Sequence, residues 1–293
     1  MQAIIDIGST SVRLCFCDLE KAVNEKQVET TRLAENQTAD GELWRPALIR
    51  TAEAVEKFVS VARSSGFEPE IFATEAVRSA SNRDEFLKAV FEKTGKKITV
   101  VEKEDEAKLA FFGVYNSAAG RVGIVDMGGG STELCVGDEK GVLYAHSLPE
   151  GAVRLTNRER AGGNVKKYLS EAVKEYGAVP DFSELIAVGG TACTVAAVLE
   201  NMKTYDPQKI QGRRVSRAEI QALYDRIKTM PEEERKKICG MPEKRAGIIH
   251  NGLLFYLEIL DYLKKDAFTV SDRDNVEGFA IYLQNGKKWP NLV

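Results

Sequence analysis

The stretch Gly123-Ile-Val-Asp-Met-Gly-Gly-Gly-Ser-Thr-Glu-Leu-Cys-Val136 decides the fold of this chain. Its apolar run predicts a buried strand over residues 123–127, then a glycine turn and a second strand that opens at Ser131. Ala3-Ile-Ile-Asp-Ile-Gly-Ser-Thr-Ser-Val-Arg-Leu-Cys-Phe16 repeats this plan near the start of the chain. Two copies of one hairpin predict two similar half-molecules that face each other across a cleft.

The second hairpin surrounds its turn with groups that suit a phosphate. Glycine has no Cβ, so backbone N–H groups of such a turn can close on phosphate oxygens, and nearby hydroxyls add donors. Carboxylates beside the turn can hold the divalent cation that a bound phosphate chain needs as a counter-charge. Three glycines alone would suit an ordinary hairpin, but a carboxylate on each side favours a phosphate site. The candidate residues are Gly128, Gly129, Gly130, Ser131 and Thr132, with Asp126 and Glu133 as metal ligands.

The composition is that of an ordinary globular protein. The 293 residues suggest two domains, and 43% hydrophobic with 29% charged residues are sufficient for a substantial core. A formal net charge of −3 provides no global basic field, so neither nucleic acid nor a membrane is an expected partner. The five cysteines form no CxxC pair, and two histidines are too few for a His-rich metal site. With no signal peptide and no long apolar run, a cytoplasmic location is expected.

Strands and helices alternate along the chain, which predicts α/β layers. In the first half we expect strands over 27–32, 70–74 and 97–101, and helices over 43–62, 84–94 (capped by Asn82) and 102–115. In the second half we expect strands over 141–148, 184–188 and 267–270, and helices over 165–176, 192–200, 216–228, 242–263 and 276–284. The strand over 184–188 runs into Gly189, Gly190 and Thr191 before a helix, and free N–H groups there offer a further seat for an anion or a nucleoside.

These residues resemble the exopolyphosphatase/guanosine pentaphosphate phosphohydrolase (Ppx/GppA) family, within the superfamily of acetate kinase, sugar kinases, Hsp70 and actin. Besides the two hairpins, the match is carried by Ala73-Thr-Glu-Ala-Val-Arg-Ser-Ala-Ser-Asn82, Gly151-Ala-Val-Arg-Leu-Thr156, Gly189-Gly-Thr191 and Ser271-Asp-Arg273 with Glu277-Gly278. It implies an α/β fold of two RNase H-like (actin-like ATPase) domains across a cleft. The expected domains are residues 1–118, joined by the last helix (276–293), and residues 119–275.

In that family, water attacks the terminal phosphoryl group of polyphosphate or of guanosine pentaphosphate. The resemblance assigns the base that activates the water to Glu106; Asp105, one residue away, and Glu104 are the alternatives. Arg78 corresponds to a phosphate-binding arginine, since a guanidinium matches a pair of phosphate oxygens. Without that motif, a lone arginine would more commonly form a surface ion pair.

The resemblance also assigns the remaining contacts in the cleft. Asp126 and Glu133 correspond to carboxylates that hold Mg²⁺ or another divalent cation, and Asp6 either joins them or only stabilises its own turn. Arg13, a strand residue, either contacts substrate or faces solvent. The other implied contacts are Ser9, Thr10, Ser11, Asn82, Gly189, Gly190 and Thr191. By analogy, a homodimer would be unsurprising.

Three positions depart from the family's usual pattern. Thr10 replaces an asparagine, Glu102-Lys103 replaces Ser-Gly before the acidic helix, and Val276 stands where an arginine is usual. Two other functions stay open. One is an ATP-using kinase or ATPase of the same superfamily, with ATP at the same two loops. The other is a binding protein that senses polyphosphate or (p)ppGpp with little activity, which the changes at Glu102-Lys103 and Val276 favour. His146 and His250 have no partner motif and are expected to be structural.

Overall fold

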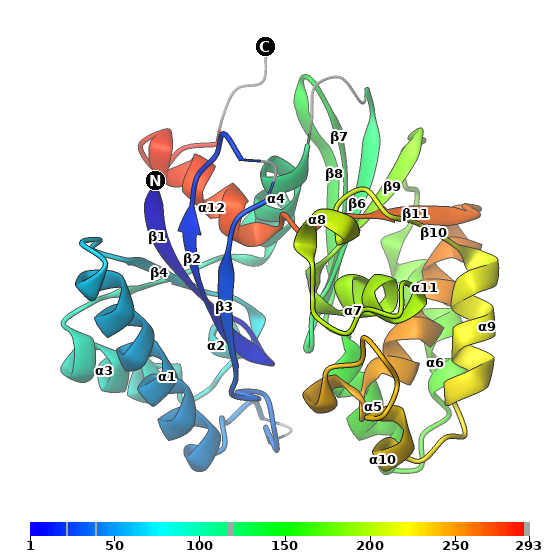
Figure 1. The fold of residues 1–293 in the computed structure, drawn as a ribbon, viewed down its shortest axis with the longest axis horizontal. Helices are drawn as coiled ribbons and strands as arrows, with labels where there is room; N and C mark the ends of the chain where they lie inside the picture. The colour runs from blue at the N-terminus through cyan, green and yellow to red at the C-terminus, as the bar shows by residue number, and fades with distance from the viewer. Residues whose placement is uncertain (22, 39, 116–119, 290–293) are drawn as a thin grey trace.

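Two β-sheets, each flanked by helices, lie side by side in the computed structural model (Figure 1). The structure describes residues 1–289 except 22, 39 and 116–119. Each half begins with an antiparallel hairpin, and the first strand of each hairpin has a parallel neighbour on its other side. The repeated plan confirms the predicted α/β fold of two similar halves. The predicted domain boundary falls on residues 116–119, outside those described.

The elements of the first half are β1 (Gln2–Ile7), β2 (Ser11–Cys17), β3 (Lys26–Thr30), α1 (Arg45–Ser64), β4 (Glu70–Ala73), α2 (Glu75–Arg78), α3 (Arg83–Thr94), β5 (Ile98–Val100) and α4 (Lys103–Val114). The strands form one sheet in the order β3-β2-β1-β4-β5. Residues 3–7 of β1 are all buried, because the central strand is covered on both faces. Apolar residues of α1, such as Val55 and Phe58, pack on this sheet.

The elements of the second half are β6 (Val122–Met127), β7 (Thr132–Asp138), β8 (Gly141–Leu148), α5 (Ala152–Arg160), α6 (Val165–Ala172), β9 (Glu184–Val188), α7 (Gly189–Leu199), α8 (Pro207–Ile210), β10 (Arg214–Ser216), α9 (Arg217–Ile227), α10 (Glu232–Arg235), α11 (Ile249–Leu263), β11 (Ala267–Val270) and α12 (Asn275–Gln284). Its strands lie in the order β10-β11-β9-β6-β7-β8. The buried helix α11 supplies Leu253 and Phe255 to the core of this half.

The last helix, α12, packs against α4 and against β1 and β2 of the first half. Phe279 of α12 lies in one apolar cluster with Ile4, Phe72 and Leu109. The two helices approach so closely that a Cβ on Gly278 would lie 1.9 Å from the backbone oxygen of Leu109. Glycine is therefore required at this crossing for its size rather than for its backbone conformation.

Several predicted boundaries and one predicted cap were wrong. The helix expected over 192–200 begins three residues earlier, at Gly189, because the strand–glycine junction passes directly into helix. The helix expected over 242–263 is shorter and begins at Ile249. The side chain of Asn82 does not cap α3; it accepts from the N–H and donates to the C=O of Leu43, and so ties down the loop before α1. The pattern of the sequence did not predict α2, α5, α8 or β10.

The helices of the described part of the chain include none that is both long enough and apolar enough to cross a membrane. His250, expected to be structural, is buried between Arg235 and Glu159, with its ring nitrogens 2.6 Å and 2.7 Å from their side chains. Residues 232–237 are all charged, but Arg235 points inward and donates a hydrogen bond to the carbonyl of Ile227.

Candidate active site

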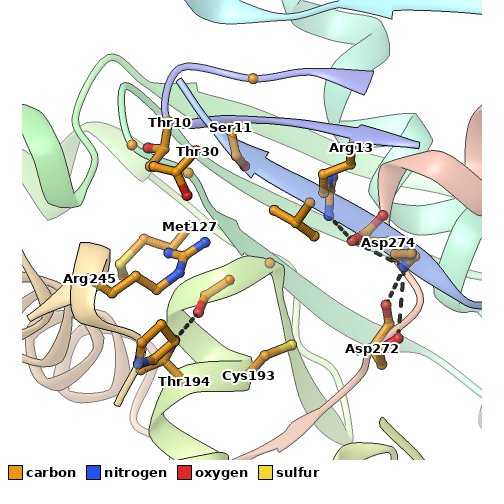
Figure 2. A pocket seen from close by; sticks show the side chains of 18 of the residues that line it. Thr10, Ser11, Arg13, Thr30, Met127, Cys193, Thr194, Arg245, Asp272 and Asp274 are labelled. Atoms are coloured by element: carbon orange, nitrogen blue, oxygen red, sulfur yellow. Dashed lines mark hydrogen bonds and ion pairs between the residues drawn. The ribbon is translucent and has the colours of Figure 1, made fainter. Parts of the chain in front are cut away.

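The turns of the two hairpins meet at a cavity of about 940 Å³ that lies between the halves (Figure 2). In the close-up, Thr10 and Ser11 reach this cavity from the first half, and Met127, Cys193 and Thr194 reach it from the second. The predicted site residues that line it are Asp6, Ser9, Thr10, Ser11, Arg13, Glu106, Asp126, Gly128, Gly129, Gly130, Ser131, Glu133, Gly189 and Gly190.

The two turns touch, and this contact explains two of the glycines. A Cβ on Gly129 would lie 2.3 Å from the Thr10 hydroxyl oxygen, and one on Gly130 would lie 2.9 Å from that of Ser9. Any side chain at these positions would push the halves apart. The second turn is also held from behind, since the N–H groups of Ala152 and Val153 at the start of α5 donate to the carbonyls of Gly128 and Gly129.

The junction of β9 with α7 requires glycine for two reasons. Gly189 has φ +83°, in the left-handed region, and a Cβ there would lie 2.7 Å from the Oδ1 atom of Asp126. Gly190 lies directly under Arg245, whose Nη2 atom would be 1.7 Å from a Cβ. Both glycines thus make room for side chains of the cavity wall.

Four buried carboxylates face the cavity from different elements: Asp6 from β1, Glu106 from α4, Asp126 from β6 and Glu133 from β7. Asp126 accepts a hydrogen bond of 2.7 Å from the amide of Asn275, and Glu133 accepts one of 2.7 Å from Ser147. Burial, aided by the neighbouring carboxylates, raises the pKa of Glu106 to about 7 and that of Asp126 to about 7. The same causes raise the pKa of Glu133 well above its usual value.

Glu106 is the candidate base that the structure places at the cavity. Its Oε2 atom lies 2.6 Å from Nη1 of Arg78, which also donates to the carbonyl of Val101 at 2.8 Å. Asp105 instead points away from the cavity and accepts hydrogen bonds from Lys108 and from the Trp289 indole. The side chain of Glu104 lies outside what the structure describes.

Four predicted site residues do not line the cavity: Arg78, Asn82, Thr132 and Thr191. Arg78 lies behind Glu106 rather than in the cavity wall, and Asn82 is bonded to Leu43 as described above. The Thr132 hydroxyl donates to the carbonyl of Glu150 at 2.8 Å and is fully buried. Thr191 is buried against Gly252 of α11. The structure thus gives each of these side chains a packing or positioning contact.

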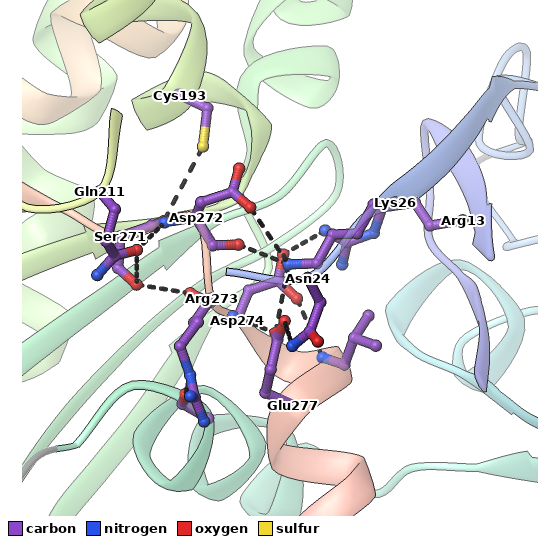
Figure 3. Close-up of polar contacts among 12 residues, drawn as sticks. Arg13, Asn24, Lys26, Cys193, Gln211, Ser271, Asp272, Arg273, Asp274 and Glu277 are labelled. Carbon is purple, nitrogen blue, oxygen red and sulfur yellow. Dashed lines mark hydrogen bonds and ion pairs between the residues drawn. The ribbon is translucent and has the colours of Figure 1, made fainter. Parts of the chain in front are cut away.

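Arg13 faces the cavity and not solvent, so the solvent alternative was wrong (Figure 2). Its guanidinium forms ion pairs with Asp6 and with Asp274, and Asp274 belongs to the polar network of Figure 3. Lys26 approaches Asp274 at 3.4 Å and Glu277 at 3.3 Å. Although burial acts in the opposite direction, Arg13 and Lys26 lower the pKa of Asp274 to about 2. This network joins the first sheet to the segment that precedes α12.

The cavity extends beyond the two turns to residues that the sequence analysis did not single out. These come from α7, from the loop before α8 and from the segment before α11, and they include Cys193, Thr194, Tyr205, Met241 and Arg245. Figure 2 shows the Arg245 side chain directed into the cavity from the side opposite Arg13. The glycine pair at 189–190 was the feature of the sequence that indicated this part of the cavity, because glycine at the start of a helix lets another group approach the backbone closely.

The cleft carboxylates suit a hard divalent cation, because Mg²⁺ prefers carboxylate oxygens. Burial is the main cause of the raised pKa values of Asp126 and Glu133, and a bound cation would favour their ionised forms and relieve the repulsion from neighbouring carboxylates. Within the described ranges, the one group of three ligand atoms that all lie within 4.8 Å of each other belongs to Cys15, Cys17 and Glu277, outside the cavity. The wider spacing in the cleft fits a cation that keeps several waters and shares phosphate oxygens, as is usual for Mg²⁺.

The family model of the Ppx/GppA phosphatase family matches residues 20–283 of the chain. The chain belongs to the Ppx/GppA phosphatase family. It is 32% identical to a bifunctional 3-dehydroquinate synthase/phosphatase of Fusobacterium nucleatum, over 95% of this chain but only 46% of that protein. It is 28% identical to exopolyphosphatase 2 of Mycobacterium tuberculosis, over 96% of this chain and 98% of the relative.

Two solved structures of similar proteins have the same fold. The Aquifex aeolicus family member superposes with a TM-score of 0.79 at 30% identity, covering 98% of each chain. An exopolyphosphatase-like protein superposes with a TM-score of 0.84 at 26% identity, over 97% of this chain and 98% of the other. The two halves described above are therefore the two halves of the actin-like ATPase fold, as the resemblance implied.

The raised pKa of Asp126 predicts how a neutral variant affects stability. An aspartate titrates near 3.8 when unfolded but near 7 here, so the folded state keeps a proton that the unfolded state releases. This group therefore costs stability increasingly as pH rises from about 4 to 7. Without divalent cations, Asp126→Asn should raise the free energy of unfolding by about 4 kcal/mol at pH 8 and by roughly half as much at pH 5.5.

Thermal denaturation at the two pH values, with and without Mg²⁺, measures this effect. Asp138→Asn on β7 is the matched control, since a backbone hydrogen bond from Lys140 and the Arg121 side chain lower the pKa of Asp138. Its replacement should not stabilise the protein. An Asp126→Asn effect that is equal at pH 5.5 and pH 8 would contradict the assignment.

Proposed function

We propose that this chain hydrolyses the terminal phosphoanhydride bond of inorganic polyphosphate, with guanosine pentaphosphate as the alternative substrate. One observation carries the proposal: the Glu106 carboxylate, with its pKa raised to about 7, opens onto the cavity in which two phosphate-type glycine turns meet. A carboxylate with a pKa near 7 is largely ionised at neutral pH, and it is basic enough to accept a proton from water. The name of the mycobacterial relative supports polyphosphate as the substrate class.

The turns would hold the phosphate chain. The N–H of Gly128 is used within the turn, where it donates to the carbonyl of Ser131. Gly129 and Gly130 line the cavity together with Ser9, Thr10 and Ser131, and their N–H and O–H groups can donate to phosphate oxygens. Donors held in place before the substrate arrives stabilise the charge that develops on the phosphoryl group during transfer. The terminal phosphoryl group is then expected beside Glu106.

Glu106 would remove a proton from the attacking water. The oxygen of that water forms the new bond to the terminal phosphorus while the bond to the bridging oxygen breaks, which releases orthophosphate and the shortened chain. Arg78 holds the Glu106 carboxylate from behind and leaves its other oxygen for the water. We assign Asp126 and Glu133, with Asp6, to hold Mg²⁺, which would neutralise phosphate charge when bound.

Guanosine pentaphosphate is the second candidate because the cavity continues past the turns. Its second wall combines an apolar surface at Met241 and Cys193 with the cationic Arg245. A polyphosphate chain does not need an apolar wall, whereas a nucleoside would bury against one. The two substrates therefore make different use of the wall opposite the glycine turns.

The test is phosphate release in Mg²⁺ from long-chain polyphosphate, tripolyphosphate, guanosine pentaphosphate and ATP. Release from one of the first three supports the hydrolase and identifies its substrate. Release or transfer from ATP alone would favour a kinase or ATPase, and tight binding without release would favour a sensor. EDTA should abolish release, and excess Mg²⁺ should restore it.

Arg78→Met should shift the pH dependence of this activity. Arg78 lowers the pKa of Glu106 against the larger effect of burial, so its removal should raise that pKa further above 7. The base would then be protonated at neutral pH, and kcat at pH 7 should fall about ten-fold or more, with partial recovery near pH 9. A pH–rate profile of the variant measures the shift, and a uniform loss at every pH would contradict this role.

A further inference from the structure

Glu75 forms a contact between the halves that the mechanism above does not use. It is the first residue of α2, in the first half, and its side chain is 13% exposed. Its Oε1 atom accepts from Nη2 of Arg154 at 3.0 Å, and Arg154 belongs to α5, in the second half. Figure 1 shows that α2 and α5 belong to different halves.

The other oxygen of Glu75 leads to the candidate base. Oε2 accepts from Nη2 of Arg78 at 2.7 Å, while Nη1 of Arg78 lies 2.6 Å from Glu106. Arg78 is thus divided between two carboxylates and keeps a fixed orientation. The four side chains form one line of ion pairs from α5 through Glu75 and Arg78 to Glu106.

Arg154 is firmly attached to the glycine turn of the second half. Its backbone N–H donates to the carbonyl of Gly129, and its Nη1 atom donates to the carbonyl of Pro149. Glu75 also lies against this turn, because its Cγ atom would be 3.5 Å from a Cβ on Gly130. Separation of the two turns would therefore break the pair between Glu75 and Arg154.

We propose that Glu75 is a positioning residue that holds the two halves closed through Arg154 and keeps Arg78 directed at Glu106. The inference rests on the proposed function, in which Glu106 is the base and the phosphate chain lies between the two turns. Closure of two halves around a ligand is a common motion, and an ion pair across the opening shifts its equilibrium toward the closed state.

The direction in which KM changes in Glu75→Gln distinguishes this role from a purely electrostatic one. If Glu75 acted only through its charge, Glu75→Gln would remove a negative charge near the cleft and tighten binding of a polyanion. If Glu75 holds the halves closed, the same variant should raise KM for polyphosphate roughly five-fold, the change expected from one partly exposed ion pair. It should also lower kcat, because Arg78 loses one of its two partners.

Arg154→Met should separate the two roles. It should raise KM to the same extent and leave kcat within about two-fold of wild type, since Arg154 does not touch Arg78 or Glu106. The double variant should have the KM of either single variant, whereas two independent charge effects of opposite sign would cancel. Arg158→Met is the matched control, because Arg158 lies one turn further along α5 and pairs with Glu150 of its own half at 3.1 Å.

Small-angle X-ray scattering of the ligand-free variants gives a readout that does not depend on activity. Glu75→Gln and Arg154→Met should each have a larger radius of gyration than wild type, and Arg158→Met should not. A wild type that releases no phosphate, together with these scattering changes, would refute the hydrolase and keep the closing contact. Unchanged scattering, a lower KM in Glu75→Gln, or a rise in KM in Arg158→Met equal to that in Arg154→Met would overturn the inference.

Discussion

Glu106→Gln should lower kcat for phosphate release by roughly 10²- to 10⁴-fold, the usual contribution of a general base. Glutamine keeps the size of the side chain and can still accept from Arg78, so the wall of the cavity should remain in place. Binding of the phosphate chain should be kept or slightly tightened, because a buried negative charge is removed. Steady-state kinetics and calorimetric binding of tripolyphosphate measure the two effects separately.

Asp105→Asn is the matched control for the base. It is the neighbouring carboxylate on the same helix, and it bonds to Lys108 and Trp289 away from the cavity. We expect its kcat to stay near that of wild type. If instead Glu106→Gln remained active and Asp105→Asn did not, the assignment of the base would be wrong, and the register of α4 with it.

Gly278→Ala should destabilise the protein by about 3 kcal/mol or more, since overpacking against a backbone cannot be relieved by a change of rotamer. The added methyl group would lie 1.9 Å from the carbonyl oxygen of Leu109. The same crossing leaves no room for a side chain at Gly113, where a Cβ would lie 2.0 Å from the carbonyl oxygen of Asp274. The melting temperature should fall by roughly 5–10 °C. Because Glu106 is on the displaced helix α4, activity should also fall below the unfolding temperature.

Gly66→Ala is the control for this variant. Gly66 has φ +83° but nothing within 4 Å of an added Cβ, so alanine there introduces backbone strain without a clash. Its cost should be about 1 kcal/mol, well below that of Gly278→Ala. Equal losses from the two variants would indicate that the crossing of α4 and α12 can adjust.

Repetition and local pattern were sufficient to predict the fold. Two hairpins with carboxylates and hydroxyls around a tight turn predicted two similar halves, because each hairpin is a local structure set by residues adjacent in the chain. The position of the cavity, and the part of its lining that the two turns supply, followed from the same two stretches. The family resemblance added Glu106, which lies on neither hairpin.

Long-range pairing could not be predicted from the sequence. The sequence allowed Arg13 to face solvent, whereas the tertiary structure places Asp274 beside it. The sequence also allowed Asn82 to cap a helix, whereas its side-chain amide hydrogen-bonds to both the N–H and the C=O of Leu43. The pairing of Arg78 with Glu106 and the pairing of Arg154 with Glu75 join residues that only folding brings together.

The sequence by itself determined which residue types surround each turn, and hence the two halves, the phosphate-type cleft and the family. Only the tertiary structure decided which charges meet, which glycines are required by close approach, and which side chains line the cavity rather than support it. The physical reason is that a hairpin depends on neighbours in the chain. The orientation and pKa of a buried charge depend on every element packed around it.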